Sequence, residues 1–141
     1  MAVQTNAEHP NELFPISEYG RSGYIDSFGR VIVPPEYHMT SDFTEGLGLV
    51  ANWDEGLGYV DLHGELVIPL EFDDAGSFSE GLALVHVDGQ EHYIDKTGQI
   101  VINEPFDTAG TFFSEGLVEG KINHHWGYID KTGRIVIAPP L

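Results

Sequence analysis

The sequence predicts an all-β fold made of about four tandem copies of a three-stranded antiparallel meander, each of about 35 residues. Two recurring blocks of residues indicate this fold. The first reads Gly-Tyr-Ile-Asp, two residues, Gly and, after one or two further residues, Val-Ile, and its copies contain Tyr24, Tyr59, Tyr93 and Tyr128. The second reads Phe-Ser/Thr-Glu-Gly-Leu and begins at Phe43, Phe78 and Phe113. Two blocks that recur together at one period predict a repeat architecture.

Within each copy, the tyrosine segment and the Val-Ile segment are predicted to form a β-hairpin. Both segments are rich in β-branched and aromatic residues, and a short turn that begins with Asp and ends with Gly joins them. The turn aspartates are Asp26, Asp61, Asp95 and Asp130. An Asp side chain can accept a hydrogen bond from the backbone two residues on, and Gly tolerates the positive φ of a type I turn with a bulge. We therefore expect a structural role for these aspartates rather than cation binding.

A third strand is expected before each hairpin, at residues 13–16, 47–51, 82–87 and 117–122. Polar turns at 52–57, 88–91 and 123–126 lead from it into the tyrosine strand, and the first of these turns is one residue longer. The predicted units are then residues 12–35, 43–69, 78–103 and 113–138. Linkers between them carry aromatic residues that we expect to pack inward: Tyr37, Phe43, Phe72, Phe78, Phe106 and Phe113.

A single three-stranded meander is too small to bury its apolar face, so the units must stack. Two arrangements are open, an open superhelical or solenoid-like array and a small propeller-like ring. Residues 12–141 are predicted to form one repeat domain. Residues 1–11 are polar and without a regular period, and we expect them to form a flexible tail.

Composition excludes several classes of function. The chain has no cysteine, so disulfides, thiolate nucleophiles and thiolate-ligated metals are impossible. A net charge of −17 repels nucleic acid and acidic membranes. The sequence contains neither a signal-peptide pattern nor an apolar run long enough to cross a bilayer. We expect a cytoplasmic protein that does not bind nucleic acid or membranes.

Residues 126–137 read Trp-Gly-Tyr-Ile-Asp-Lys-Thr-Gly-Arg-Ile-Val-Ile and resemble the repeat unit of the bacterial WG (also called KWG) repeat family. The Phe-Ser-Glu-Gly-Leu blocks are similar to the other half of that unit, and the resemblance covers roughly residues 13–141. Trp126 is replaced by Ser22, Leu57 and Glu91 in the other copies, and His92 replaces the Gly of the motif. The resemblance implies a repeat scaffold that serves as an interaction module, and it implies no shared catalytic residue.

Catalytic and metal sites are not predicted. Glu45, Glu80 and Glu115 recur once in each copy, whereas an active site is normally assembled once from nonequivalent groups. We therefore expect them at turns or strand starts. The seven histidines show no zinc-binding spacing, and only His124 and His125 are adjacent. No cofactor is predicted.

Residues that depart from the repeat are the candidates for partner binding, since function on a repeat scaffold is carried by such departures. They fall near the turn between the first two strands of a copy, and we expect these turns to lie along one side of the stack. The candidates are Trp53, Asp54, Glu55, Glu91, His92, His124, His125 and Trp126.

The predicted function is a non-enzymatic module that binds a protein partner, with a basic face on the partner as one option. The alternative is a lectin-like module that binds carbohydrate or cell wall through its tryptophans. A hydrolase that uses carboxylates such as Glu80 and Glu115 is less favoured, because it needs two acids about 5–10 Å apart in one cleft.

Overall fold

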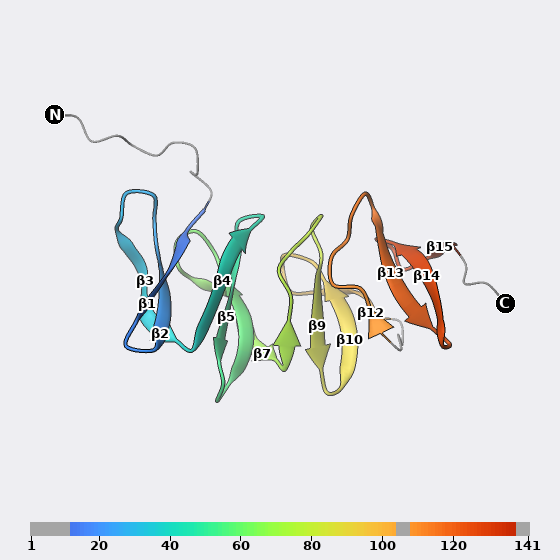
Figure 1. The fold of residues 1–141 in the computed structure, drawn as a ribbon, viewed down its shortest axis with the longest axis horizontal. Helices are drawn as coiled ribbons and strands as arrows, with labels where there is room; N and C mark the ends of the chain where they lie inside the picture. Colours follow the sequence, from blue (N-terminus) through green and yellow to red (C-terminus); the bar gives the residue numbers. More distant parts are fainter. Residues whose placement is uncertain (1–11, 104–107, 138–141) are drawn as a thin grey trace. The chain divides into compact units, whose positions relative to one another are not determined.

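The computed structural model describes residues 12–103 and 108–137, and these residues form antiparallel β-sheets (Figure 1). The expected flexible tail at residues 1–11 and the aromatic Phe106 lie outside the described residues. Within the described ranges there are fifteen strands and no helix, and so no helix that is long and apolar enough to span a membrane. The all-β prediction is confirmed.

The strands form four open sheets in two compact units, residues 1–71 and 72–141. Sheet 1 contains β1 (Phe14–Glu18), β2 (Arg21–Ile25) and β3 (Val31–Tyr37), and sheet 2 contains β4 (Met39–Thr44), β5 (Leu47–Asn52), β6 (Gly56–Val60) and β7 (Leu66–Phe72). Sheet 3 contains β8 (Asp74–Ala75), β9 (Ala83–Val87), β10 (Gln90–Ile94) and β11 (Ile100–Ile102). Sheet 4 contains β12 (Thr108–Ala109), β13 (Leu117–Ile122), β14 (His125–Asp130) and β15 (Ile135–Ile137). The single domain over residues 12–141 and the choice between array and ring stay predictions.

Sheets 2, 3 and 4 have one strand more than the predicted meander. The linker before each copy supplies it as β4, β8 or β12, which pairs antiparallel with the strand that follows. The strands β8 and β12 contain two residues each, which is too short to produce a periodic sequence signal. The linkers are therefore part of the sheets.

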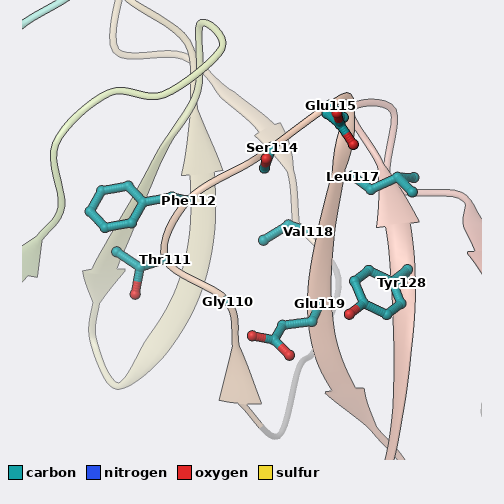
Figure 2. A pocket seen from close by; sticks show the side chains of 9 residues that line it. All are labelled: Gly110, Thr111, Phe112, Ser114, Glu115, Leu117, Val118, Glu119 and Tyr128. Carbon is teal, nitrogen blue, oxygen red and sulfur yellow. The ribbon is translucent and has the colours of Figure 1, made fainter.

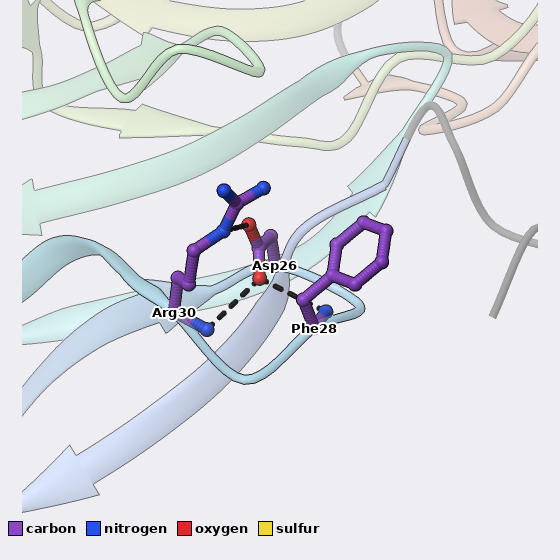
Figure 3. Close-up of polar contacts among 3 residues, drawn as sticks. All are labelled: Asp26, Phe28 and Arg30. Atoms are coloured by element: carbon purple, nitrogen blue, oxygen red, sulfur yellow. Dashed lines mark hydrogen bonds and ion pairs between the residues drawn. The ribbon is translucent and has the colours of Figure 1, made fainter. Parts of the chain in front are cut away.

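The predicted Asp turns are present in all four copies. In the first, Asp26 Oδ1 accepts the backbone N–H groups of Phe28 and Arg30, each at 2.9 Å, as Figure 3 shows. The turn closes at Gly29, which has a φ of 83°. Equivalent bonds to the backbone occur at Asp61, Asp95 and Asp130. The expected structural role of the aspartates is confirmed.

The recurring glutamates form a second kind of turn. Glu45 and Gly46 both have positive φ, 53° and 84°, as expected for the two central residues of a type I′ hairpin turn. The same pair of conformations occurs at Glu80 and Gly81 and at Glu115 and Gly116. The prediction that these glutamates lie at turns is confirmed.

In each unit, a buried tyrosine of one sheet packs on a phenylalanine of the next. In unit 1, the rings of Tyr24 and Phe43 meet edge to face with centroids 4.9 Å apart, and the Tyr24 hydroxyl donates to the Ser41 carbonyl at 2.6 Å. In unit 2, Tyr93 and Phe113 meet edge to face at 5.1 Å. The linker aromatics Phe43, Phe72, Phe78 and Phe113 are buried as predicted, and Tyr37 is partly buried.

Gly23 and Gly58 allow a close approach of the third strand. A Cβ atom on Gly23 would lie 2.1 Å from the Val33 carbonyl oxygen, and one on Gly58 would lie 2.4 Å from that of Ile68. In the third copy His92 occupies this position, and β11 ends after three residues whereas β3 and β7 each have seven. In the fourth copy Gly127 is retained and β15 also has three residues, so the length of the third strand does not follow the glycine.

Candidate interaction surfaces

The turn between β5 and β6 displays three of the predicted contact residues. Asn52 pairs with Gly56, so Trp53, Asp54 and Glu55 form a three-residue loop. The matching turn between β9 and β10 contains only two residues, because Val87 pairs with Gln90. The extra residue was visible in the sequence. All three side chains of the loop are exposed, and 62% of Trp53 is accessible to solvent.

The Trp53 indole is supported by two residues that the sequence did not single out as contacts. The His38 ring stacks on it with centroids 6.1 Å apart and an interplanar angle of 23°. His38 Nδ1 lies 3.1 Å from the Trp53 backbone nitrogen, and Arg21 Nη1 lies 2.8 Å from His38 Nε2. Both neighbours are donors and an imidazole has at most one acceptor nitrogen, so only one of these two contacts is a hydrogen bond in a given tautomer. We call Arg21, His38 and Trp53 the indole platform.

A second exposed indole lies on the β13–β14 hairpin of unit 2. Asn123 and His124 form its two-residue turn with φ values of 53° and 68°. His125 and Trp126 follow on β14, and 51% of Trp126 is exposed. The predicted residues His124, His125 and Trp126 thus share one hairpin. Neighbouring residues on a strand point to opposite faces, so His125 and Trp126 do not form one continuous surface.

The remaining two predicted contacts are not displayed. Glu91 is partly buried: its Oε1 accepts the Ala109 backbone N–H at 3.3 Å and its Oε2 lies 3.5 Å from His86 Nε2. His92 is 8% exposed, and its Nδ1 has no hydrogen-bond partner among the residues that the structure describes. Both residues lie on β10, beyond the two-residue turn, and so inside the sheet. The expectation that His92 is presented at the surface is wrong.

The recurring carboxylates act as acceptors for backbone N–H groups. Glu80 accepts bonds from the N–H groups of Gly116, at 2.7 Å, and of Glu115, and Lys131 Nζ lies 3.5 Å from it. The Gly116 bond is the main cause that holds the pKa of Glu80 below its ordinary value. At Asp95 and Asp130 the hydroxyls of Thr97 and Thr132 are the main cause of a lowered pKa. For Asp26, partial desolvation raises the pKa, but bonds from Arg30 and Phe28 outweigh it.

Each unit also contains an open cavity. In unit 1, a cavity of about 480 Å³ is lined by Phe28, Arg30 and Leu62 among others. The Arg30 guanidinium lies 5.1 Å from the centroid of the Phe28 ring and its Nε lies 2.7 Å from Asp26 Oδ2 (Figure 3). In unit 2, a cavity of about 600 Å³ lies between residues 110–114 and strand β13 (Figure 2). No group of three or more His, Asp or Glu side chains is arranged for a metal ion within residues 12–103 and 108–137.

The family described as WG containing repeat matches this sequence at residues 23–52, 58–90, 93–119 and 126–139. The chain belongs to the WG repeat family. No curated protein matches it. The first WG repeat begins on β2 and ends on β5, so it joins β2 and β3 of sheet 1 to β4 and β5 of sheet 2. The contacting rings of Tyr24 and Phe43 therefore belong to one WG repeat, and so do those of Tyr93 and Phe113.

Proposed function

We propose that this WG repeat protein is a non-enzymatic interaction module that binds a protein partner through the Trp53 loop and the Trp126 hairpin. The observation that carries the proposal is the exposure of both indoles on β-hairpins, one in each unit. Trp is enriched among the residues that dominate protein interfaces, because it supplies a large contact area at low entropic cost.

The indole platform supports the role of Trp53 in particular. A side chain that is already held by stacking loses less conformational freedom when a partner binds. His38 stacks on the indole and Arg21 contacts His38, so the ring has a restricted orientation before binding. The adjacent Asp54 and Glu55 and the net charge of −17 favour a partner with a basic face.

The hydrogen bonds of the recurring carboxylates support a non-enzymatic role. Asp26, Asp95 and Asp130 accept bonds from their own turns, and Glu80 accepts bonds from the turn at Glu115. Each carboxylate is thus used to hold backbone geometry. A general acid or base must exchange a proton with the substrate. The hydrogen bonds from the backbone occupy carboxylate oxygens that would otherwise be available for this exchange.

Affinity capture with matched variants tests the proposal. The tagged wild-type protein, Trp53→Ala, Trp126→Ala and the control Phe28→Ala are incubated with a cell lysate at physiological salt, and bound proteins are identified by mass spectrometry. Phe28 is also an exposed aromatic residue but lies outside both hairpins. We expect one partner that is retained by wild type and Phe28→Ala and lost by at least one tryptophan variant. Equal retention by all four proteins would refute the assignment of the contact residues.

A lectin-like function is the second candidate, because Trp53 has carboxylates on the two following residues. An exposed ring can stack on a sugar, and carboxylate oxygens can accept hydrogen bonds from its hydroxyls. Titration with soluble oligosaccharides and cell-wall fragments, followed by Trp fluorescence, distinguishes the two candidates. A saturable fluorescence change that is lost in Trp53→Ala would favour carbohydrate over protein.

A further inference from the structure

Tyr128 departs from the burial of its counterparts in the other copies. Tyr24, Tyr59 and Tyr93 are at most 1% exposed, whereas 41% of Tyr128 is exposed. The cross-strand neighbour of Tyr128 is Ile137, and 51% of its side chain is exposed. In the third copy, Tyr93 pairs with Ile102, which is buried. One face of sheet 4 is therefore open to solvent around Tyr128.

The strand beside Tyr128 is more polar than in the two preceding copies. Tyr59 and Tyr93 lie opposite the buried leucines Leu49 and Leu84, and Tyr128 lies opposite the exposed Glu119. Burial of this carboxylate under another apolar sheet would be costly without a cationic partner. The open face therefore does not favour a purely apolar occupant.

The cavity of unit 2 reaches this face and combines aromatic rings with carboxylates. Figure 2 shows Glu119 and Tyr128 on the neighbouring strands β13 and β14, Glu115 at the turn, and Phe112 on the loop across from them. Among the described residues that line the cavity there is no Lys or Arg. Lys121 lies two residues along β13 from Glu119 and is not among the lining residues. The cavity is thus suited to a cationic group with an apolar surface.

We propose that this cavity binds an arginine side chain of a basic peptide segment. A guanidinium group is planar, donates two parallel hydrogen bonds to a carboxylate and stacks on aromatic rings. Glu119 supplies the carboxylate and Tyr128 the ring, while Glu115, at the turn before β13, adds negative charge to the lining. This proposal rests on the proposed function only for the class of partner, which is a protein segment. The residues that bind it are different from Trp53 and Trp126.

An NMR titration of the ¹⁵N-labelled chain with acetyl-Gly-Arg-Gly-amide tests the proposal. The control ligand replaces arginine by citrulline, which keeps the shape and removes the charge. Saturable shifts are expected at Glu115, Glu119 and Tyr128 with arginine, and no saturation is expected with citrulline. Glu119→Gln and Tyr128→Ala should each weaken binding by about threefold to tenfold. Glu36→Gln removes the same charge from an exposed position in unit 1 and should leave the affinity unchanged.

Two results would overturn the arginine site: shifts distributed over all acidic residues, or an equal effect of Glu36→Gln and Glu119→Gln. Either one would mean that the peptide responds only to the net charge. Equal affinity for a Gly-Lys-Gly peptide would contradict the preference for a planar group. The proposed partner binding fails separately, because its capture experiment depends on Trp53 and Trp126. Glu119→Gln should leave both indoles in place, which their fluorescence spectrum checks.

Discussion

Glu80 holds the backbone of Glu115: its carboxylate accepts the N–H groups of Glu115 and of the following Gly116. Both glutamates occupy the same position of a Ser-Glu-Gly-Leu turn, and both have a left-handed backbone with φ near 53°. This conformation is unfavourable for a residue with a side chain, and Asn or Gly usually occupies it. The Glu80 side chain is long enough to reach the next turn, and this contact explains why residue 80 is a glutamate.

Replacement of Glu80 by Gln is expected to lower the melting temperature at pH 7. The pKa of Glu80 in the folded protein lies below its ordinary value, chiefly because Gly116 donates to the carboxylate. Its contribution is therefore fully present above the unfolded pKa near 4.5 and is lost as the pH falls through the lower folded pKa. Thermal unfolding of wild type and Glu80→Gln is measured from pH 7 to pH 3. The difference between their melting temperatures should decrease as the pH falls. A difference that does not change with pH would contradict this account.

Tyr93→Phe is expected to reduce the free energy of unfolding by about 1 kcal/mol, the usual net value of one hydrogen bond. The substitution keeps the ring on Phe113 and removes the bond from the hydroxyl to the Gly110 carbonyl. The matched control is Tyr128→Phe, whose hydroxyl belongs to a half-exposed side chain. Urea denaturation of both variants measures the difference, and equal losses would argue against the Gly110 bond.

Two adjacent phenylalanines should respond differently to truncation. Phe113 is buried between sheets 3 and 4, whereas Phe112 is exposed. We expect Phe113→Ala to cost about 3–5 kcal/mol, as for other buried aromatic residues. Phe112→Ala should change stability by less than about 0.5 kcal/mol. Comparable unfolding midpoints for the two variants would show that residue 113 is not the one that fills the core.

The pKa of Asp95 should rise when Thr97 is replaced by Val. The Thr97 hydroxyl donates to Asp95 Oδ1 and is the main cause of the lowered pKa. The substitution removes this donor and keeps the side-chain shape. A carboxyl-carbon NMR titration should show the pKa of Asp95 moving toward its ordinary value of 3.8. Thr132→Val is the control, because it should move the pKa of Asp130 and leave that of Asp95 in place.

The features that recur in the sequence were predictable because each depends on neighbouring residues. The Asp turns need an Asp and a Gly at fixed spacing, and the glutamate turns need only Glu-Gly between two strands. The indole platform was not predictable, since its three residues lie on different segments that meet only after the sheets form. For a related reason, the prediction that His92 is exposed was wrong, and the exposure of Tyr128 was not predicted. Their exposure depends on the neighbouring strands and sheets rather than on the motif that contains them.

The strand order of the sheets bears on how the chain folds. Among the described residues, every paired strand is the neighbour of its partner in the sequence. Such pairings close only short loops, so little chain entropy is lost before each new contact forms. Each sheet can therefore assemble as its own strands leave the ribosome, without waiting for residues far along the chain. A chain of this kind is expected to fold rapidly for a β protein.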